Sequence, residues 1–517
     1  MKRVKRVLAL LAALALVLAM AVPAFAEEAT CSITAPNNEH NYEVYQIFTG
    51  TLSEDKGTKV LSDIKWGQNS KNRDAGANVG DKVSETVLKE ITDVATKSDS
   101  EKLDVIEKYV DLTAGKKFTT VNSGTTQNVP AGYYLIKDAD NSYGNQHGAY
   151  TQFIVEVAGN VNFKPKMDYP TVEKKVKENS KETGTTGDYG EKYNDVADYS
   201  IGDAVPFKLI GSVPDMSQYS TYKYTFHDTL AKSLTVPAET NVKVYMSSNK
   251  AGSGKQDITS NFTVAVSGQV ITVSTDNLKA INDISANKYI LVEYSAVLNS
   301  DAAINNNNVN DTDNGNINKV YLTYSNNPRN ESEAGKTPED TVIVFTYEIK
   351  ATKVDGETNK GLEGVKFRIY KMSGDDKWYA QVAEGKLNGW VTTANDDCVL
   401  TSGEGGKFSL AGLDDGTYFI EEITPLPGYN SIDPVEIKIN GNTNNGQSGN
   451  GATSELTSVK FTVGKTTADA ITIVNNAGTT LPSTGGMGTT VFYVVGGGLM
   501  AVAVVLLVTK KRMENKR

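Results

Sequence analysis

The amino-acid sequence predicts a mostly β protein made of tandem immunoglobulin-like β-sandwich domains. Between residues 27 and 480 the chain consists largely of short runs rich in Val, Ile, Thr, Tyr and Phe, separated by clusters of Asn, Gly, Asp and Ser. This pattern is typical of short antiparallel strands joined by turns. Residues 81–112 depart from it, because Val83, Val87 and Ile91 recur at helical spacing, and we expect a helical insertion in the first domain.

The N-terminus predicts a secretory signal peptide at residues 1–26. Lys2, Arg3, Lys5 and Arg6 precede an Ala/Leu core, and the segment closes on the small-residue word "AFA". A retained membrane anchor is the alternative, but a small-residue exit without a stop-transfer flank disfavours it. The mature chain is therefore expected to begin near Glu27.

The C-terminal region predicts a membrane-spanning segment at residues 489–508. This segment is uncharged and mostly apolar over about the length of a bilayer core, and Lys510, Lys511 and Arg512 follow at once. Positive flanks favour the cytoplasmic side of a membrane. We therefore expect the residues between the signal peptide and this segment to lie outside the membrane.

The composition argues against several classes of function. The chain has 52 Lys and Arg against 62 Asp and Glu, a net charge of -10, which gives no support for nucleic-acid binding. The three His show no ligand spacing, and no phosphate-binding Gly loop or "GxSxG" motif occurs, so no metal, no cofactor and no conventional enzyme activity are expected. Cys31 and Cys398 are too few and too far apart in sequence for a disulfide framework.

Two polar, Pro-containing segments predict the domain boundaries. The first, "VNFKPKMDYPTVEKK", contains Pro165 and Pro170, which cannot donate to a strand ladder. The second, "YSNNPRNESEAGKTPEDTV", is polar and precedes a new strand-like run. The predicted domains are therefore 27–168, 169–340 and 341–480.

Three polar residues of the third domain continue the inward-facing phase of predicted strands. Alternate residues of a strand share one face. Lys353 continues the apolar phase of "YEIKATKV", Asn475 that of "ITIVNN" and Glu422 that of "YFIEE". An amine, an amide and a carboxyl group are thus predicted to point into one core.

Burial would prepare these groups to react with one another. Apolar surroundings favour neutral Lys, which is nucleophilic, and protonated Glu, which can polarise the Asn carbonyl. Loss of ammonia would leave an isopeptide bond between Lys353 and Asn475. Closing a loop of over a hundred residues would add about 4–5 kcal/mol by chain-entropy arguments, and the bond cannot be reduced.

The middle domain repeats this ordered trio. Lys174 in "TVEKKV", Asp228 in "YKYTFHD" and Asn326 in "YLTYSNN" each continue an apolar phase, which predicts a Lys174–Asn326 bond assisted by Asp228. Asp203 in "YSIGDAVPF" is an alternative acid. For any single residue, a strand end in solvent or a Lys whose amine reaches past apolar neighbours is the simpler interpretation. The same trio in two domains favours isopeptide chemistry.

The C-terminal motif and the two trios carry a family resemblance. "LPSTG" fits the sortase motif LPxTG through Leu481, Pro482, Thr484 and Gly485, and the apolar span and basic tail follow it. With these features the chain resembles the shaft-forming major pilins of Gram-positive bacteria over essentially its full length. The resemblance implies a cell-wall sorting signal at 481–517, cleavage between Thr484 and Gly485, and transfer of Thr484 to a sortase Cys.

Two further motifs support the resemblance. "YFIEEITPLPGY" resembles the pilin E-box YxLxETxAPxGY, which implies a Cna B-type fold and an assisting role for Glu422. It departs from the E-box at Ile423, where the family has Thr, and in the placement of its prolines, Pro425 and Pro427. In the first domain, "AGYYLIKD" lacks the E-box Glu, so no cross-link is predicted there.

The segment "NFKPKMDYP" resembles the pilin motif, a variant of VYPK. In this family the Lys of the motif attacks the thioester of the incoming subunit. Lys166 follows Pro165 in an extended interdomain segment and is the predicted polymerisation residue, with Lys164 as its first substitute. An ordinary solvated linker Lys is the alternative, because Lys164 replaces the usual Tyr of the motif.

The resemblance implies the major subunit of a covalent surface pilus that mediates adhesion. The expected partners are a class C sortase, a housekeeping sortase and peptidoglycan, identical subunits, minor pilins and a host surface ligand. The expected location is the cell wall, reached from a secreted precursor held in the membrane by the C-terminal helix. The alternatives are a monomeric LPXTG-anchored adhesin, a minor pilin at the base or tip, and a wall-bound hydrolase.

Overall fold

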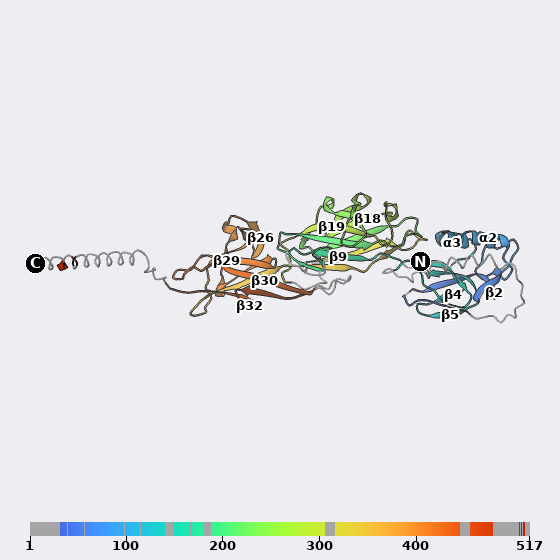
Figure 1. Ribbon diagram of the computed structural model, residues 1–517, viewed down its shortest axis with the longest axis horizontal. Helices are drawn as coiled ribbons and strands as arrows, with labels where there is room; N and C mark the ends of the chain where they lie inside the picture. The colour runs from blue at the N-terminus through green and yellow to red at the C-terminus, as the bar shows by residue number, and fades with distance from the viewer. Residues whose placement is uncertain are drawn as a thin grey trace. The chain divides into compact units, whose positions relative to one another are not determined.

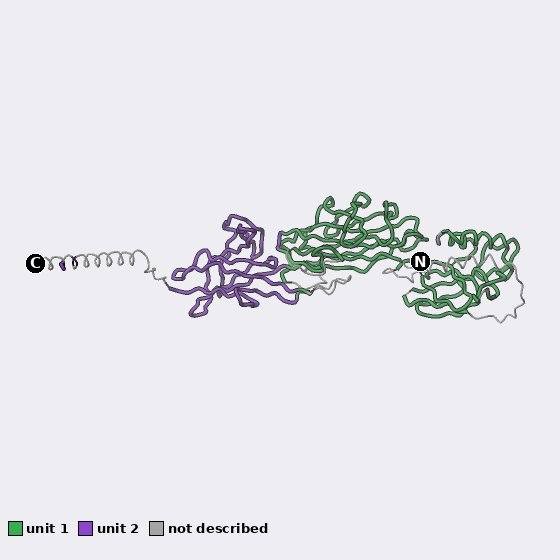
Figure 2. Tube along the Cα trace, viewed as in Figure 1, with its two compact units in different colours: residues 1–199, 203–345, 443–456 green, residues 200–202, 346–442, 457–517 purple. Residues whose placement is uncertain are grey.

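A computed structural model of the protein describes residues 31–478, apart from 39, 56, 98, 114, 140–147, 166–167, 180–187, 306–315 and 445–454, together with residues 506, 508, 510 and 511. The chain divides into two compact units (Figure 2). The larger lies within 1–199, 203–345 and 443–456, and the smaller within 200–202, 346–442 and 457–517. Strands are the main secondary structure in both units, which confirms the predicted mostly β fold (Figure 1).

Among the described residues, the N-terminal part of the larger unit contains two sheets and two helices. One sheet has the order β5-β1-β8, and the other has the order β3-β2-β6-β7 with β4 beside β2. Their bounds are β1 (Cys31–Thr34), β2 (Tyr42–Asp55), β3 (Thr58–Trp66), β4 (Thr119–Val121), β5 (Thr126–Val129), β6 (Gly132–Asp138), β7 (Gln152–Val157) and β8 (Asn160–Asn162).

The two helices confirm the predicted helical insertion. They are α2 (Glu85–Asp93) and α3 (Asp99–Ile106). Ser84 caps α2, because its hydroxyl accepts a hydrogen bond from the backbone N–H of Val87. Val87 and Ile91 are buried in the same apolar cluster as Trp66 of β3, so the amphipathic spacing seats α2 on the second sheet.

The middle part of the larger unit consists of two seven-stranded sheets that pack against each other. The first has the order β10-β9-β12-β19-β15-β16, with β14 beside β19. Its strands are β9 (Val172–Lys177), β10 (Tyr193–Asn194), β12 (Ala204–Ser212), β14 (Leu234–Thr235), β15 (Lys243–Ser247), β16 (Gln256–Asp257) and β19 (Tyr289–Leu298).

The second sheet has the order β11-β22-β20-β13-β18-β17, with β21 beside β20. Its strands are β11 (Val196–Asp198), β13 (Tyr224–Leu230), β17 (Thr263–Ser267), β18 (Val270–Thr275), β20 (Ile317–Ser325), β21 (Ala334–Lys336) and β22 (Asp340–Phe345). Short 3-10 turns connect the strands, namely η1 (Glu239–Asn241), η2 (Thr259–Asn261) and η3 (Leu278–Ala280). Alternating buried residues such as Phe207, Val292 and Leu322 fill the space between the sheets.

The smaller unit is built on one eleven-stranded sheet of order β32-β31-β30-β29-β24-β25-β26-β28-β23-β33, with β27 beside β24. The first and last strands, β23 (Tyr347–Asp355) and β33 (Ile471–Asn475), are neighbours and run parallel. The others are β24 (Lys366–Ser373), β25 (Asp376–Ala383), β26 (Lys386–Val391), β27 (Leu400–Thr401), β28 (Lys407–Leu413), β29 (Gly416–Thr424), β30 (Val435–Asn444), β31 (Glu455–Val463) and β32 (Thr466–Ala468), with η4 (Asp396–Cys398) and η5 (Glu404–Gly406) between them.

Candidate functional site

Lys353, Glu422 and Asn475 meet inside the smaller unit, on β23, β29 and β33. Lys353 Nζ lies 2.9 Å from Glu422 Oε2, and Asn475 Nδ2 donates to Glu422 Oε1 at 3.1 Å. Lys353 is 0% and Asn475 1% exposed. The structure thus assembles the predicted amine, amide and carboxylate around one acid, because β23 and β33 pair with Asp355 opposite Asn475.

Burial shapes the chemistry of this cluster. Desolvation lowers the pKa of Lys353, although the ion pair with Glu422 opposes the shift. The amide oxygen of Asn475 accepts no hydrogen bond from the described residues. Because a half-turn of the amide exchanges its oxygen and nitrogen, a protonated Glu422 could donate to that oxygen and polarise the carbonyl.

The E-box turn holds the end of β23 beside this cluster. Gly428 has a φ of +88°, a conformation that favours glycine. It lets the chain turn so that the hydroxyl of the next residue, Tyr429, donates to Asp355 Oδ2 at 2.8 Å. Asp355 is the last residue of β23, two positions after Lys353. The glycine and tyrosine of the motif therefore help to hold in place the strand that carries Lys353.

A second cluster lies between the two sheets of the middle part. Lys174 of β9 forms an ion pair with Asp228 of β13, and both side chains are 0% exposed. Tyr294 of β19 donates to Asp228, and Asn318 Nδ2 of β20 donates to the Tyr294 hydroxyl at 2.7 Å. An amine, a carboxylate and an amide again meet in a dry core, here with a phenol among them.

The electrostatics of the second cluster resemble those of the first. Burial lowers the pKa of Lys174 to about 8, against the opposing effect of Asp228. Burial also raises the pKa of Asp228, and the nearby Lys174 ammonium opposes that shift. Both shifts favour a neutral pair, which is the state in which an amine can attack an amide. The Asn318 amide oxygen accepts no hydrogen bond from the described residues.

The structure corrects the amide predicted for the middle domain. Asp228 lies opposite Val320 and Leu230 lies opposite Asn318 in the ladder between β13 and β20. Asn326 is six residues beyond Val320, a distance of about 20 Å along an extended chain, which a Lys side chain cannot cover. The amide beside Lys174 is therefore Asn318, not Asn326. Among the two acids considered, the geometry places Asp228, not Asp203, against the Lys174 amine.

Sequence reasoning missed two other groups of buried residues. Lys175, adjacent to Lys174 but on the opposite strand face, forms a fully buried ion pair with Asp195. Lys208 Nζ donates to the backbone oxygens of Tyr189 and Ala251 at 3.0 and 3.1 Å. Strand phase does not single out either Lys, because these contacting groups lie outside their own strands, 19 to 43 residues away in sequence.

The N-terminal part of the larger unit, which holds the predicted first domain, presents a different arrangement. Lys137 Nζ lies 2.9 Å from Glu43 Oε2, and both side chains are largely buried. The buried Asp138 carboxylate interacts with His40 Nδ1 at 2.8 Å. That this domain forms no cross-link remains a prediction.

Several predicted functional residues lie outside the described part of the chain. They are the signal peptide at 1–26, Lys166, the sorting residues Leu481, Pro482, Thr484 and Gly485, and most of 489–508. The substitute Lys164 is described and exposed. Among the described residues, no helix has both the length and the apolarity needed to cross a membrane.

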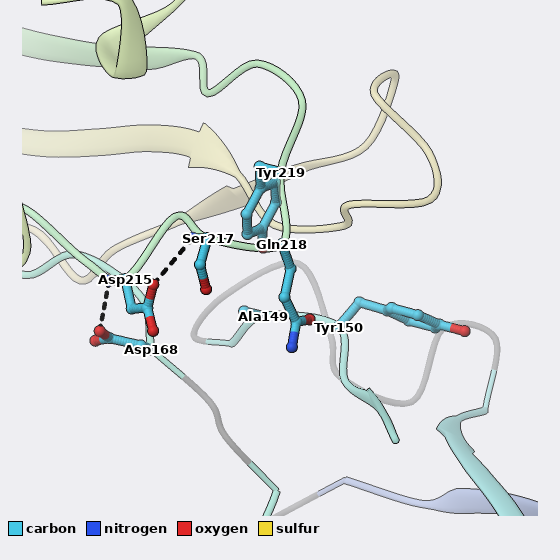
Figure 3. A pocket seen from close by; sticks show the side chains of 7 residues that line it. All are labelled: Ala149, Tyr150, Asp168, Asp215, Ser217, Gln218 and Tyr219. Atoms are coloured by element: carbon cyan, nitrogen blue, oxygen red, sulfur yellow. Dashed lines mark hydrogen bonds between the residues drawn. The ribbon is translucent and has the colours of Figure 1, made fainter. Parts of the chain in front are cut away.

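A small pocket in the larger unit is lined by Asp168, Asp215 and Tyr219, among others (Figure 3). The backbone N–H of Asp215 donates to Asp168 Oδ2 at 2.6 Å, and that of Ser217 donates to Asp215 Oδ1 at 2.9 Å. Its volume of about 40 Å³ suits a water molecule or two and not an organic substrate. The Asp168 and Asp215 carboxylates on its wall already accept these backbone hydrogen bonds.

Comparison with known families finds three matches along the chain. Residues 201–328 match the Gram-positive pilin backbone subunit 2, Cna-B-like domain. Residues 347–452 match the SpaA prealbumin-like fold domain, and residues 473–515 match the LPXTG cell wall anchor motif. The two matched domain families and the C-terminal motif are thus of the kinds that the sequence indicated, and the anchor motif marks a cell-wall surface protein.

Two curated proteins are similar in sequence. Fimbrial subunit type 2 of Actinomyces naeslundii is 25% identical over 335 residues, which cover 62% of this chain and 59% of that protein. The trypsin-resistant surface T6 protein of Streptococcus pyogenes is 26% identical over 268 residues, 48% of this chain and 43% of that protein. The matched region therefore spans about half the length of these relatives.

Solved structures of backbone pilins are also similar. The T6 backbone pilin of Streptococcus pyogenes is 16% identical, with a TM-score of 0.47 over 88% of this chain and 100% of that one. The major pilin SpaA of Corynebacterium diphtheriae is 14% identical, with a TM-score of 0.43 over 86% and 99%. From its pilin-backbone domain, its SpaA domain and its LPXTG motif, the chain belongs to the backbone pilins of Gram-positive bacteria.

Proposed function

We propose that this backbone pilin polymerises into a covalent fibre and that two of its domains are locked by autocatalytic Lys–Asn isopeptide bonds. The pilin family is structural and not an enzyme family. The observation that carries the proposal is the occurrence of two enclosed Lys–acid–Asn clusters, Lys353–Glu422–Asn475 and Lys174–Asp228–Asn318. Isolated buried charges are costly, and bond formation removes the charge on each amine.

The reaction proposed for each cluster is a single condensation. A neutral Lys amine attacks the Asn side-chain carbonyl carbon, and a bond forms between Lys Nζ and Asn Cγ. The bond from Cγ to Nδ2 then breaks, and the amide nitrogen leaves as ammonia with a proton that the Lys has released. Glu422 or Asp228 accepts the proton from the amine and supplies it to the leaving nitrogen. Each acid ends in the protonation state in which it began.

For polymerisation, we propose that a class C sortase cleaves between Thr484 and Gly485 and joins Thr484 to Lys166 of the next subunit. The match of 473–515 to the LPXTG anchor motif supports sortase processing. A housekeeping sortase would attach the finished fibre to peptidoglycan. Minor pilins and a host surface ligand complete the set of proposed partners, in line with the adhesive role expected of such fibres.

Tryptic peptide mapping of the full-length chain tests the internal bonds. Each bond should yield a branched peptide lighter than the sum of its parts by one ammonia, about 17 Da. Trypsin cleaves after Lys319 and thus separates Asn318 from Asn326. The map therefore reports which amide is joined to Lys174. Recovery of only linear peptides containing Lys174 and Lys353 would refute the internal bonds.

A matched pair of variants tests the role of the acid in the smaller unit. Glu422→Ala should abolish the Lys353–Asn475 branched peptide, because Glu422 is the acid that contacts both side chains in the described part of the chain. Glu421→Ala is the control, since Glu421 lies on the opposite face of β29 and pairs with Lys377 at 3.2 Å. The control should retain the branched peptide at the wild-type yield.

A further inference from the structure

Tyr294 occupies the centre of the middle cluster. Its hydroxyl donates to Asp228 Oδ2, accepts from Asn318 Nδ2 at 2.7 Å and lies 3.3 Å from Lys174 Nζ. One hydroxyl therefore contacts every group that would take part in the condensation. Tyr294 is also buried, and its ring lies under the Lys174 amine, with the ring centroid 5.7 Å from Nζ.

The cluster in the smaller unit achieves the same connection without a phenol. There, Glu422 contacts both the Lys353 amine and the Asn475 amide directly. In the middle cluster no hydrogen bond joins Asp228 to Asn318 among the described residues, and the path from acid to amide runs through Tyr294. Asp is shorter than Glu by one methylene, and the Tyr294 hydroxyl fills the resulting gap.

The geometry points to Tyr294 as a catalytic residue that relays a proton from Asp228 to the leaving amide nitrogen of Asn318. This inference rests on the proposed isopeptide chemistry. As the Cγ–Nδ2 bond breaks, Tyr294 gives its hydroxyl proton to Nδ2 and takes the proton of Asp228 in its place. Asp228 in turn regains a proton from the Lys174 nitrogen that has just bonded to Cγ. Lys amine and Asn amide become a secondary amide and ammonia, and both Tyr294 and Asp228 are regenerated.

The surroundings suit a relay and not a phenolate nucleophile. Burial raises the pKa of the Tyr294 hydroxyl far above its ordinary value, and the Asp228 carboxylate raises it further. The hydroxyl therefore stays protonated and exchanges protons in a concerted transfer. The core excludes bulk water, since Lys174, Asp228 and Asn318 are each 0% exposed, so proton transfer through bulk solvent does not compete with the relay.

A time course of peptide mapping on the full-length chain tests the relay. In the wild type, the Lys174–Asn318 branched peptide must form. Its absence would refute the proposed isopeptide bond of the middle cluster itself. In Tyr294→Phe we expect this bond to form at least about ten-fold more slowly, as for loss of a general acid–base group. The Lys353–Asn475 bond of the same molecule is the internal reference and should form at the wild-type rate.

Two comparisons separate proton relay from packing. Tyr224→Phe removes another buried hydroxyl of the same domain, one that donates to the Ser212 carbonyl at 2.9 Å, and should leave the rate unchanged. The double variant Tyr294→Phe with Asp228→Glu should recover bond formation, because the longer acid can reach Asn318 directly, as Glu422 reaches Asn475. A merely structural role would predict no rescue.

A third variant keeps the test decisive if Tyr294→Phe disturbs the fold. Replacing Tyr294 with 3,5-difluorotyrosine preserves its shape but lowers the proton affinity of its hydroxyl. The relay predicts a changed rate and a shifted pH profile for the Lys174–Asn318 bond only. Wild-type kinetics and an unchanged profile in this variant, or in a folded Tyr294→Phe protein, would overturn the role of Tyr294 while leaving the isopeptide proposal intact.

Discussion

Lys174 is held in a place where its charge is disfavoured. Its pKa falls from 10.5 to about 8, chiefly through burial. Between these values the unfolded chain binds more protons than the folded one. An unreacted Lys174 therefore destabilises the fold fully below pH 8, and the penalty is relieved as the pH rises towards 10.5. Condensation with Asn318 would remove this penalty at every pH.

The first prediction uses a chain in which the bond cannot form. In Asn318→Ala, the free energy of unfolding of the middle domain should rise between pH 8 and pH 10.5, by at most about 3 kcal/mol. Adding Lys174→Met removes the titrating amine and should flatten that part of the pH dependence. Urea unfolding of the two variants across this range gives the comparison, and parallel curves would contradict the assignment.

A second prediction concerns the neighbouring pair, Lys175 and Asp195. Both side chains are fully enclosed. Asp195→Ala leaves a buried ammonium without this carboxylate and should cost about 3–5 kcal/mol of unfolding free energy. The double variant Lys175→Met with Asp195→Leu should recover most of that loss, because it removes both charges. Denaturant unfolding measures both, and an equal loss in the double variant would argue against the ion pair as the cause.

At the level of strands, the sequence predicted which side chains point into the core better than it predicted which residues lie opposite each other on paired strands. Period-two alternation correctly turned Lys353, Glu422, Asn475, Lys174 and Asp228 inward, because one face of each strand must be apolar. It led to Asn326, which has the same phase as Asn318 but follows the last residue of β20, and phase alone does not choose between the two. That choice depends on which residue of β20 lies opposite Asp228, and long-range pairing decides it.

The sequence did not indicate a role for Tyr294, for a related reason. In β19 it alternates with Val292 and Ala296 as an ordinary core residue would, and only the neighbouring strands give its hydroxyl a function. The helical insertion was predictable, since α2 carries its own amphipathic spacing and cap. A helix that carries its own spacing and cap could thus be predicted from the sequence. A side-chain cluster formed by residues from two sheets could not.

The third prediction concerns the turn that supports β23. A Cβ on Gly406 would lie 2.1 Å from the backbone oxygen of Lys353, whereas a Cβ on Gly405 would meet nothing within 4 Å. Both residues have positive φ values, so both Ala variants carry backbone strain of about 1–2 kcal/mol. Only Gly406→Ala should also displace Lys353, at a further cost of about 1–3 kcal/mol.

Peptide mapping and thermal unfolding together test this expectation. Gly406→Ala should lose much of the Lys353–Asn475 branched peptide and melt at a lower temperature than Gly405→Ala. Gly405→Ala should keep the bond. Equal yields of the bond in the two variants would show that the position of β23 tolerates the added methyl group.

At the scale of the whole molecule, the fourth prediction concerns polymerisation. Lys166→Ala should abolish high-molecular-weight ladders of the pilin in wall extracts, because the proposed acceptor amine is gone. Lys164→Ala removes a charge two residues away and should leave the ladders intact. Immunoblots of both strains decide between the two lysines, and ladders that survive in Lys166→Ala would favour a monomeric adhesin or the use of Lys164.

The parallel pairing of β23 with β33 determines how the smaller unit would respond to a pull on its ends. In sequence order, β23 is the first strand of this unit's sheet and β33 is the last, so the chain enters the sheet through β23 and leaves it through β33. With Lys353 bonded to Asn475, tension would pass along seven residues of β23 and cross directly to the exit. The intervening residues would form a closed ring that bears no force. A fibre of such units would stretch little under flow. In an Asn475→Ala unit, by contrast, unfolding would release the chain between residues 353 and 475, which is roughly 40 nm long when fully extended.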